Sequence, residues 1–243
     1  MEDLKKTIKL LREVVTGVST LQHSNNFSIY LFSVLVMELE SLEAILLLLE
    51  SSHVRPALEL SRTIFDRTVN LKYILQDTSR VNDYIDYEKW HIYRHAKDRF
   101  KSDKNNTALK DDYVSKREQW LLVRDKFIDE NGKVFLTWNG LRLSKMAKLT
   151  NLKGTYDSFY VYSSSFAHNS ALASAVSLRK TGKNTFAPVG EPDQKEVERI
   201  VLTVILFALE SAETASKEFN LGLEHKVAQL RGGCIAKIKN SSI

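Results

Sequence analysis

Five polar residues are spaced so that they form two sets, each on one face of a helix. Arg62 and Asp66 are four residues apart, and Tyr160, Ser164 and His168 follow one another at the same interval. Because residues four apart are neighbours on a helix surface, we expect an ion pair on one helix and a line of phenol, hydroxyl and imidazole groups on another. An arginine can hold an anionic group, and a histidine can exchange a proton near neutral pH. The spacing therefore predicts one polar cluster for acid–base chemistry, provided that the two helices face each other.

The same residues also have a purely structural interpretation. A partly buried arginine and a carboxylate stabilise each other without any catalytic role, because an unpaired buried charge is costly. A tyrosine on a helix face is more often part of a packed core, with its hydroxyl bonded to a partner, and the same holds for a single histidine. The functional hypothesis depends on all five residues occurring together on otherwise apolar or small-residue faces.

Helices are the elements that must position these residues. The prolines are Pro56, Pro188 and Pro192, so the long stretch between the first two contains no proline to interrupt a helix. Apolar residues recur every three to four positions, and no alternating strand pattern competes with them. Helices are expected over residues 2–22, 27–52, 55–77, 79–103, 107–130, 143–152, 155–180, 193–220 and 224–238. The predicted fold is all-α, a single domain over residues 1–243 built as one bundle of about eight to nine helices.

Glu38, Glu40 and Glu43 lie in the middle of the apolar helix predicted over 27–52. Such a helix is expected to be buried by several neighbours. For all three glutamates we expect solvation or ion pairing rather than chemistry, because an acidic run alone has no defined reactivity.

Composition and cysteine usage point to a reducing cytoplasm. The chain is 43% hydrophobic and 27% charged, which is ordinary for a globular protein with its own core. Cys234 is the one cysteine and cannot form an internal disulfide, and residues 1–6 lack the apolar stretch of a signal peptide. The apolar runs are much shorter than the roughly 20 residues that span a bilayer, so no membrane contact is expected.

A net charge of +5 makes RNA or another anionic ligand a candidate partner. The helix predicted over 79–103 interleaves aromatic and basic side chains that could stack on bases and bind phosphates. The nucleic-acid-binding candidates are Trp90, His91, Arg94, His95 and Arg99. The alternative is an amphipathic helix whose aromatic side chains form core and whose charges face solvent.

Several common chemistries have no motif here. We find no glycine-rich phosphate loop, no Gly-x-Ser-x-Gly elbow, and no spacing of His, Cys or carboxylates that matches a metal site. Neither a cofactor nor a metal ion is therefore expected.

Two stretches of the sequence are distinctive: ALELSRTIFDRTVNLKYIL, from Ala57 to Leu75, and TWNGLRLSKMAKLTNLKGTYDSFYVYSSSFAHNS, from Thr137 to Ser170. Both resemble a bacterial family of unknown function, DUF5677. Asp66 stands where a glutamate is expected, which shortens the reach of the carboxylate. The resemblance implies that the functional positions are Arg62, Asp66, Trp138, Tyr160, Ser164 and His168.

A more distant similarity to helical toxin and phage-defence domains implies two alternative functions. In the first, the chain is a defence or toxin-type effector and a metal-independent ribonuclease: Arg62 holds a phosphate, His168 moves protons, and Tyr160 or Ser164 orients the scissile group. Such nucleases usually carry their arginine and histidine a few residues apart on one helix, whereas here two helices would have to assemble the site. In the second, the cleft formed where these two helices face each other belongs to a non-catalytic regulatory module. This module binds a small ligand or a protein from the same operon. A homo-oligomer fits either function.

Overall fold

The computed structural model describes residues 1–23, 25–167, 178–181, 185–188 and 194–240. Helices dominate this part of the chain, which confirms the predicted all-α class. The chain divides into two compact units: the first comprises Met1–Tyr73 with Ala147–Ile243, and the second comprises Ile74–Met146. We call them unit 1 and unit 2. The single domain over 1–243 stays a prediction, since this division concerns compactness and not independent folding.

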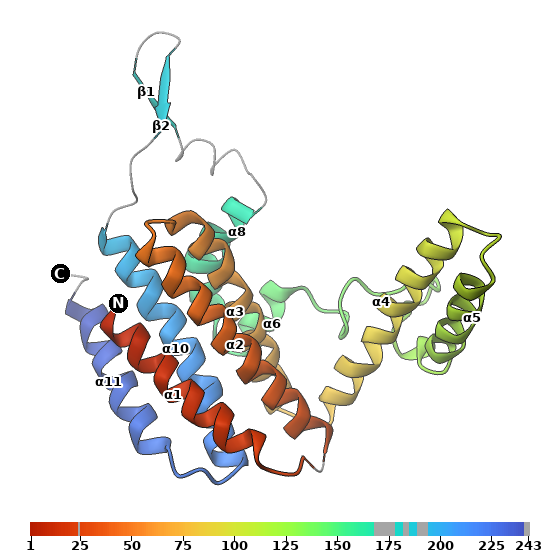
Figure 1. The fold of residues 1–243 in the computed structure, drawn as a ribbon, viewed down its shortest axis with the longest axis horizontal. Helices are drawn as coiled ribbons and strands as arrows, with labels where there is room; N and C mark the ends of the chain where they lie inside the picture. Colours follow the sequence, from red (N-terminus) through yellow and green to blue (C-terminus); the bar gives the residue numbers. More distant parts are fainter. Residues whose placement is uncertain (24, 168–177, 182–184, 189–193, 241–243) are drawn as a thin grey trace. The chain divides into compact units, whose positions relative to one another are not determined.

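Unit 1 is built around a bundle of long helices that lie side by side (Figure 1). These helices are α1 (Glu2–Ser19), α2 (Asn26–Glu50), α3 (Val54–Leu75), α10 (Gln194–Glu218) and α11 (Glu224–Asn240). Helix α1 packs against α2, α10 and α11, and α10 also packs against α2. The start of α2 is capped by Asn25, whose side chain accepts a hydrogen bond from the backbone N–H of Ser28 at 2.8 Å.

Apolar side chains fill the centre of this bundle. The fully or almost fully buried ones include Leu11, Leu31, Leu35, Leu42, Ile64, Phe65, Ile205 and Leu209. Removal of this apolar surface from water is the main force that holds the helices together. Within the described part of the chain, no helix is both long enough and apolar enough to cross a membrane.

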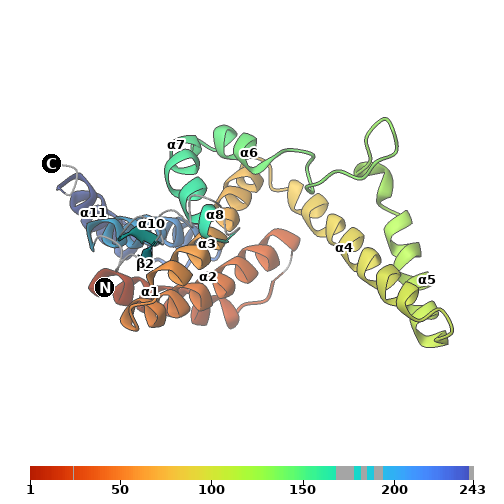
Figure 2. The same ribbon diagram turned by 90° about the horizontal axis from the view of Figure 1, so that it is seen from above.

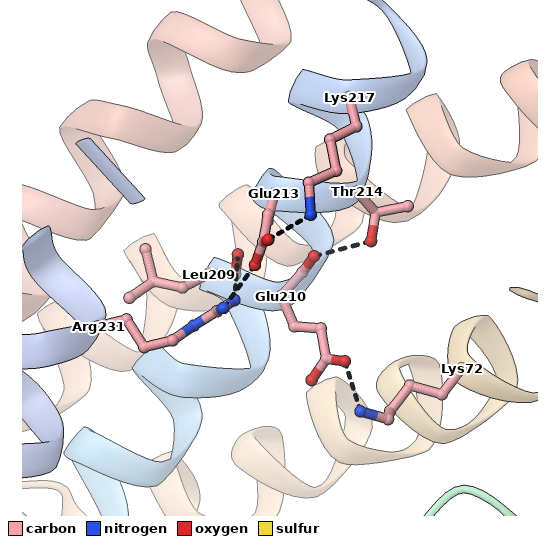
Figure 3. Close-up of polar contacts among 7 residues, drawn as sticks. All are labelled: Lys72, Leu209, Glu210, Glu213, Thr214, Lys217 and Arg231. Atoms are coloured by element: carbon pink, nitrogen blue, oxygen red, sulfur yellow. Dashed lines mark hydrogen bonds and ion pairs between the residues drawn. The ribbon is translucent and has the colours of Figure 1, made fainter. Parts of the chain in front are cut away.

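Charged residues on α10 connect this helix to two neighbours (Figure 3). The ammonium of Lys72 on α3 donates to the Glu210 carboxylate, and Arg231 on α11 donates to Glu213 and to the backbone carbonyl of Leu209. Both ion pairs are about one-third exposed, so solvent screens them and each contributes modestly to stability. The two ion pairs lie on the faces of α10 that meet α3 and α11.

A shorter helical segment carries the Tyr160 region. It comprises α6 (Leu143–Leu149), α7 (Lys153–Thr155), the π-helical turn η2 (Tyr156–Tyr160) and α8 (Val161–Ala167). The helix predicted over 155–180 is wrong at its end, because Leu178–Lys180 forms strand β1 and pairs antiparallel with β2, Phe186–Pro188. There the backbone groups bond across the hairpin rather than along a helix. Residues 168–177 of the predicted helix lie outside the described part.

Unit 2 contains two helices packed along each other, α4 (Arg80–Ser102) and α5 (Thr107–Leu121), as Figure 2 shows. The predicted helix over 107–130 is wrong beyond Leu121. A single 3₁₀ turn, η1 (Arg124–Lys126), follows, and Ile128 forms a bridge with Val134. Asp129 accepts backbone hydrogen bonds from two residues in the intervening turn, and Gly132 adopts a φ of +74°. This local turn chemistry keeps residues 129–133 out of a helix.

Candidate functional site

Three of the predicted residues meet in unit 1. The Nε of Arg62 donates a hydrogen bond to the Tyr160 hydroxyl at 3.1 Å, and the guanidinium carbon lies 5.2 Å from the centre of the Tyr160 ring. The same Nε is 3.9 Å from a carboxylate oxygen of Asp66. The Tyr160 hydroxyl in turn hydrogen-bonds the Asp66 carboxylate. We call these three residues the Arg–Asp–Tyr cluster; it joins α3 to η2, so two predicted elements do face each other here.

Partial burial changes the acid–base behaviour of the cluster. The side chain of Asp66 is 34% exposed, and that of Arg62 is 23% exposed. Burial raises the pKa of Asp66 to about 6, although the charge of Arg62, the Tyr160 hydrogen bond and the charge of Arg67 all act to lower it. Burial and the neighbouring Asp66 also raise the pKa of Tyr160, which therefore stays protonated at neutral pH. Asp66 is thus a carboxylate that can exchange a proton near neutrality.

Aromatic packing holds Tyr160 in place. The Tyr156 ring stacks on the Tyr160 ring with centroids 5.0 Å apart. Phe65, one residue before Asp66 and fully buried, contacts the rings of both tyrosines and also those of Phe159 and Phe207. These residues lie in the π-helical turn or next to it, and π turns inside helices occur frequently at functional sites. The turn and Phe65 together preorganise the phenol against α3.

The remaining residues of the predicted catalytic set are placed differently. Ser164 lies on α8, one helical turn beyond Tyr160, and is half-buried. His168 falls outside the described residues. Trp138 belongs to unit 2, where it is buried and contacts Tyr84 edge to face at 5.5 Å.

The predicted nucleic-acid-binding residues lie on α4 in unit 2. Trp90 packs against Trp120 of α5, and His91 packs edge to face on Tyr87. Arg94, His95 and Arg99 are exposed, and Arg99 lies 3.6 Å from the Asp112 carboxylate. The aromatic rings thus contribute to the packing within unit 2, as the amphipathic-helix alternative expects, while the basic groups face solvent. Binding of RNA by this helix stays a prediction.

A buried carboxyl group was missed by the sequence reasoning. The expectation of solvation or ion pairing holds for Glu40, which is exposed, and for Glu43, which pairs with Arg12 at 2.8 Å. It is wrong for Glu38 of α2. This side chain is fully buried and accepts a hydrogen bond from the hydroxyl of Ser211 on α10 at 3.0 Å. Within the described residues, its second oxygen has no hydrogen-bond partner.

The surroundings of Glu38 explain its protonation. Burial raises its pKa to about 8, a shift that the Ser211 hydrogen bond and the charge of Arg67 reduce and that the charge of Glu210 increases. Arg67 lies on α3, and its guanidinium donates hydrogen bonds to the Met37 carbonyl and the Ser41 hydroxyl of α2. Glu38 is therefore mostly protonated at neutral pH. The helical spacing of the buried residues Leu31, Leu35, Leu42 and Ile45 was the signal that could have found it.

The Arg–Asp–Tyr cluster offers a cation, a proton acceptor and a phenolic hydrogen-bond donor within a few ångström of one another. In the part of the chain that the structure describes, no group of three or more His, Cys, Asp or Glu side chains is arranged to hold a metal ion. A guanidinium can bind an anionic group, and a carboxylate beside a phenol can exchange a proton, so the three side chains together can do both.

Comparisons with known proteins agree with the resemblance of the two sequence stretches. Residues 28–185 match the model of a family described as "Family of unknown function (DUF5677)". No match was found among curated proteins or among solved structures. The matched region covers more than half of the chain and includes Arg62, Asp66 and Tyr160. The chain therefore belongs to the family of unknown function DUF5677.

Proposed function

We propose that the protein is a ribonuclease that cleaves RNA at the Arg–Asp–Tyr cluster without a metal ion. The observation that carries the proposal is the position of Asp66, whose pKa is raised to about 6, next to a guanidinium and a protonated phenol. A general base acts best when its pKa lies near the working pH. The guanidinium can stabilise the negative charge that develops on a phosphate.

The proposed reaction is an internal transfer within RNA. The Asp66 carboxylate accepts the proton of the ribose 2′-hydroxyl, and the 2′-oxygen forms a bond to the neighbouring phosphorus. The bond from phosphorus to the 5′-oxygen breaks, and this leaving oxygen takes up a proton. Among the described residues, Tyr160 is the proposed donor of that proton, and His168 is the donor that the similarity to helical toxin nucleases implies. The products are a 2′,3′-cyclic phosphate and a 5′-hydroxyl.

A non-catalytic module that binds a ligand or a partner protein is the second candidate. The mutual contacts of the cluster favour it. Arg62, Asp66 and Tyr160 already form hydrogen bonds and an ion pair with one another, so fewer of their donors and acceptors are available to a substrate. Under this alternative the three residues fix the shape of a binding surface and move no proton.

For the biological setting, we propose an effector of toxin or phage-defence type in the bacterial cytoplasm, either alone or with a protein from the same operon. The support is the distant similarity to helical defence domains, which is an analogy of fold. RNA cleavage would give such an effector a target essential to the cell.

The pH dependence of the reaction tests the proposed function. Because the base acts only when deprotonated, kcat/KM for RNA should rise about tenfold per pH unit below pH 6 and level off above it. The Tyr160→Phe variant loses a hydrogen bond that lowers the pKa of Asp66, so the midpoint of its residual activity should move to higher pH. Cleavage of a fluorescent RNA between pH 4.5 and pH 8, with and without chelator, measures both effects.

The chelator series and the Asp66 variant described in the Discussion exclude a contaminating nuclease. Activity that depends on a divalent metal ion, or a rate without a transition near pH 6, would contradict the proposed mechanism. RNA binding without any cleavage by the folded protein would instead select the non-catalytic alternative.

Binding of RNA by α4 gives a separate prediction. The logarithm of the affinity for single-stranded RNA should fall linearly with the logarithm of salt concentration, and Arg94→Ala or Arg99→Ala should reduce the steepness by about 0.7 for each phosphate that is no longer neutralised. Fluorescence polarisation at several salt concentrations measures the slope. Arg12→Ala is the matched control, because Arg12 is also an exposed arginine paired with an acid, but on α1. Equal effects of all three substitutions would argue against a site on α4.

A further inference from the structure

Unit 1 contains a cavity that is separate from the three residues of the Arg–Asp–Tyr cluster. It has a volume of about 360 Å³ and lies between the η2–α8 segment and α10. A volume of this size falls at the lower end of the range for small-molecule sites. Aromatic and aliphatic side chains form most of its wall, including Phe159, Tyr162 and Phe207. The cavity therefore suits a ligand with an apolar body.

One face of α10 forms the long side of the cavity. Arg199, Thr203, Phe207 and Glu210 line it at intervals of three to four residues, so they follow one line along the helix. Arg199 and Glu210 are eleven residues apart, which corresponds to about 16 Å along the helix axis. The lining is thus elongated, with a charged residue toward each end and apolar surface between them.

The two charged residues of this lining lie toward its opposite ends. Glu210 is paired with Lys72 of α3, as Figure 3 shows, so its negative charge is already neutralised. Arg199 is exposed at the other end and carries a guanidinium, whose fixed fork of N–H donors suits a carboxylate or a phosphate. An anionic group at the Arg199 end would therefore meet N–H donors and would lie about 16 Å along the helix from the Glu210 carboxylate, whose charge Lys72 offsets.

We propose that this cavity binds an elongated apolar molecule that ends in one anionic group, with the anionic group at Arg199 and the apolar body against Phe159 and Phe207. The proposal does not depend on RNA cleavage. The aromatic rings would contact the apolar body of the ligand. Thr203 lies between Arg199 and Phe207 along the lining face of α10.

Four probes of equal chain length test the ligand class: octanoate, octyl phosphate, 1-octanol and octylammonium. Titration calorimetry and thermal unfolding on the full-length chain give the affinities. Octanoate or octyl phosphate, or both, should bind about tenfold more tightly than octanol, because a charge-assisted hydrogen bond adds to the apolar contact. Octylammonium should bind more weakly than octanol, since Arg199 repels it. The difference between the two anions shows which head group the site prefers.

Three variants locate the binding. Arg199→Ala should weaken anion binding about tenfold and leave octanol unchanged. Lys195→Ala is the matched control, because Lys195 is an exposed cation one turn earlier on α10 and does not line the cavity. Thr203→Trp should fill the cavity and remove detectable binding of every probe, and circular dichroism verifies that this variant is folded. Should Thr203→Trp unfold, Thr203→Leu and Arg199→Ala decide the question, since Thr203 is only half-buried and Arg199 is exposed.

Three results would overturn the proposal. The first is equal affinity for octanoate, octyl phosphate and octylammonium, which would show that Arg199 selects no charge. The second is undiminished anion binding in both Arg199→Ala and a folded Thr203 variant, which would place the site elsewhere. The third is the absence of binding of all four probes at millimolar concentration.

Discussion

Asp66→Asn should lower the rate of RNA cleavage by about 100-fold or more, the effect that loss of a general base typically has. The amide cannot take up the proton of the 2′-hydroxyl. It is nearly the same size as the carboxylate and retains an oxygen that can accept the Tyr160 hydrogen bond. Binding of RNA should therefore change little, so that the loss appears in kcat. Single-turnover cleavage and polarisation binding separate the two quantities.

Asp157→Asn is the matched control for this variant. Asp157 is also the carboxylate of an ion pair between residues four apart, with Lys153, but it is exposed and belongs to neither the cluster nor the cavity lining. Both substitutions remove one negative charge from unit 1. An equal change in rate for the two variants would mean that overall charge matters and not a base. An Asp66→Asn protein that is folded and fully active would exclude proton transfer by Asp66.

The long helices of unit 1 could be predicted from the sequence because their burial is periodic. Helices α1, α2, α3 and α10 each begin and end within three residues of the predicted bounds, and α11 begins at the predicted residue 224. In each case the apolar residues that recur every three to four positions become the buried face. Tertiary packing and local pattern agree in these segments, so the local pattern was sufficient.

The two segments that differ from the prediction have local features that periodicity does not capture. The helix predicted over 107–130 stops at Leu121, and the ring of Phe127 then turns inward against Tyr87 and Trp120. Strand β1 forms only because β2 pairs with it, and three residues with one partner strand leave no periodic signal. Neither difference alters the all-α class.

The candidate site could be predicted in part. Spacing alone placed Arg62 beside Asp66, and it placed Tyr160 on a second helical face. That the two faces meet is a tertiary fact, which depends on Phe65 contacting the tyrosines of the π-helical turn. The pKa of Asp66 could not be predicted, because it is set by the depth of burial in the assembled unit.

Glu38 leads to the prediction about stability. Because burial raises its pKa from about 4.5 to about 8, the folded protein keeps this proton over a pH range in which the unfolded chain has lost it. The folded state then binds more protons than the unfolded state, so this group lowers the free energy of unfolding as pH rises from about 4.5 to about 8. Glu38→Gln cannot ionise and should lose that dependence. The free energy of unfolding of Glu38→Gln minus that of wild type should therefore increase by roughly 3–5 kcal/mol from about pH 4.5 to about pH 8.

Urea unfolding of both proteins at half-unit steps from pH 4.5 to pH 8.5 measures this difference. The comparison across pH is needed because a glutamine amide in the same place carries its own cost, from a buried N–H group that needs an acceptor, and this cost does not change with pH. Glu40→Gln is the matched control, since Glu40 is an exposed glutamate two residues along the same helix, and its difference from wild type should stay nearly constant. A flat difference for Glu38→Gln as well would mean that Glu38 is ionised in the folded state. The charge of Arg67 would then outweigh the cost of burying the carboxylate, and the interior of unit 1 would contain an ion pair in place of a neutral acid.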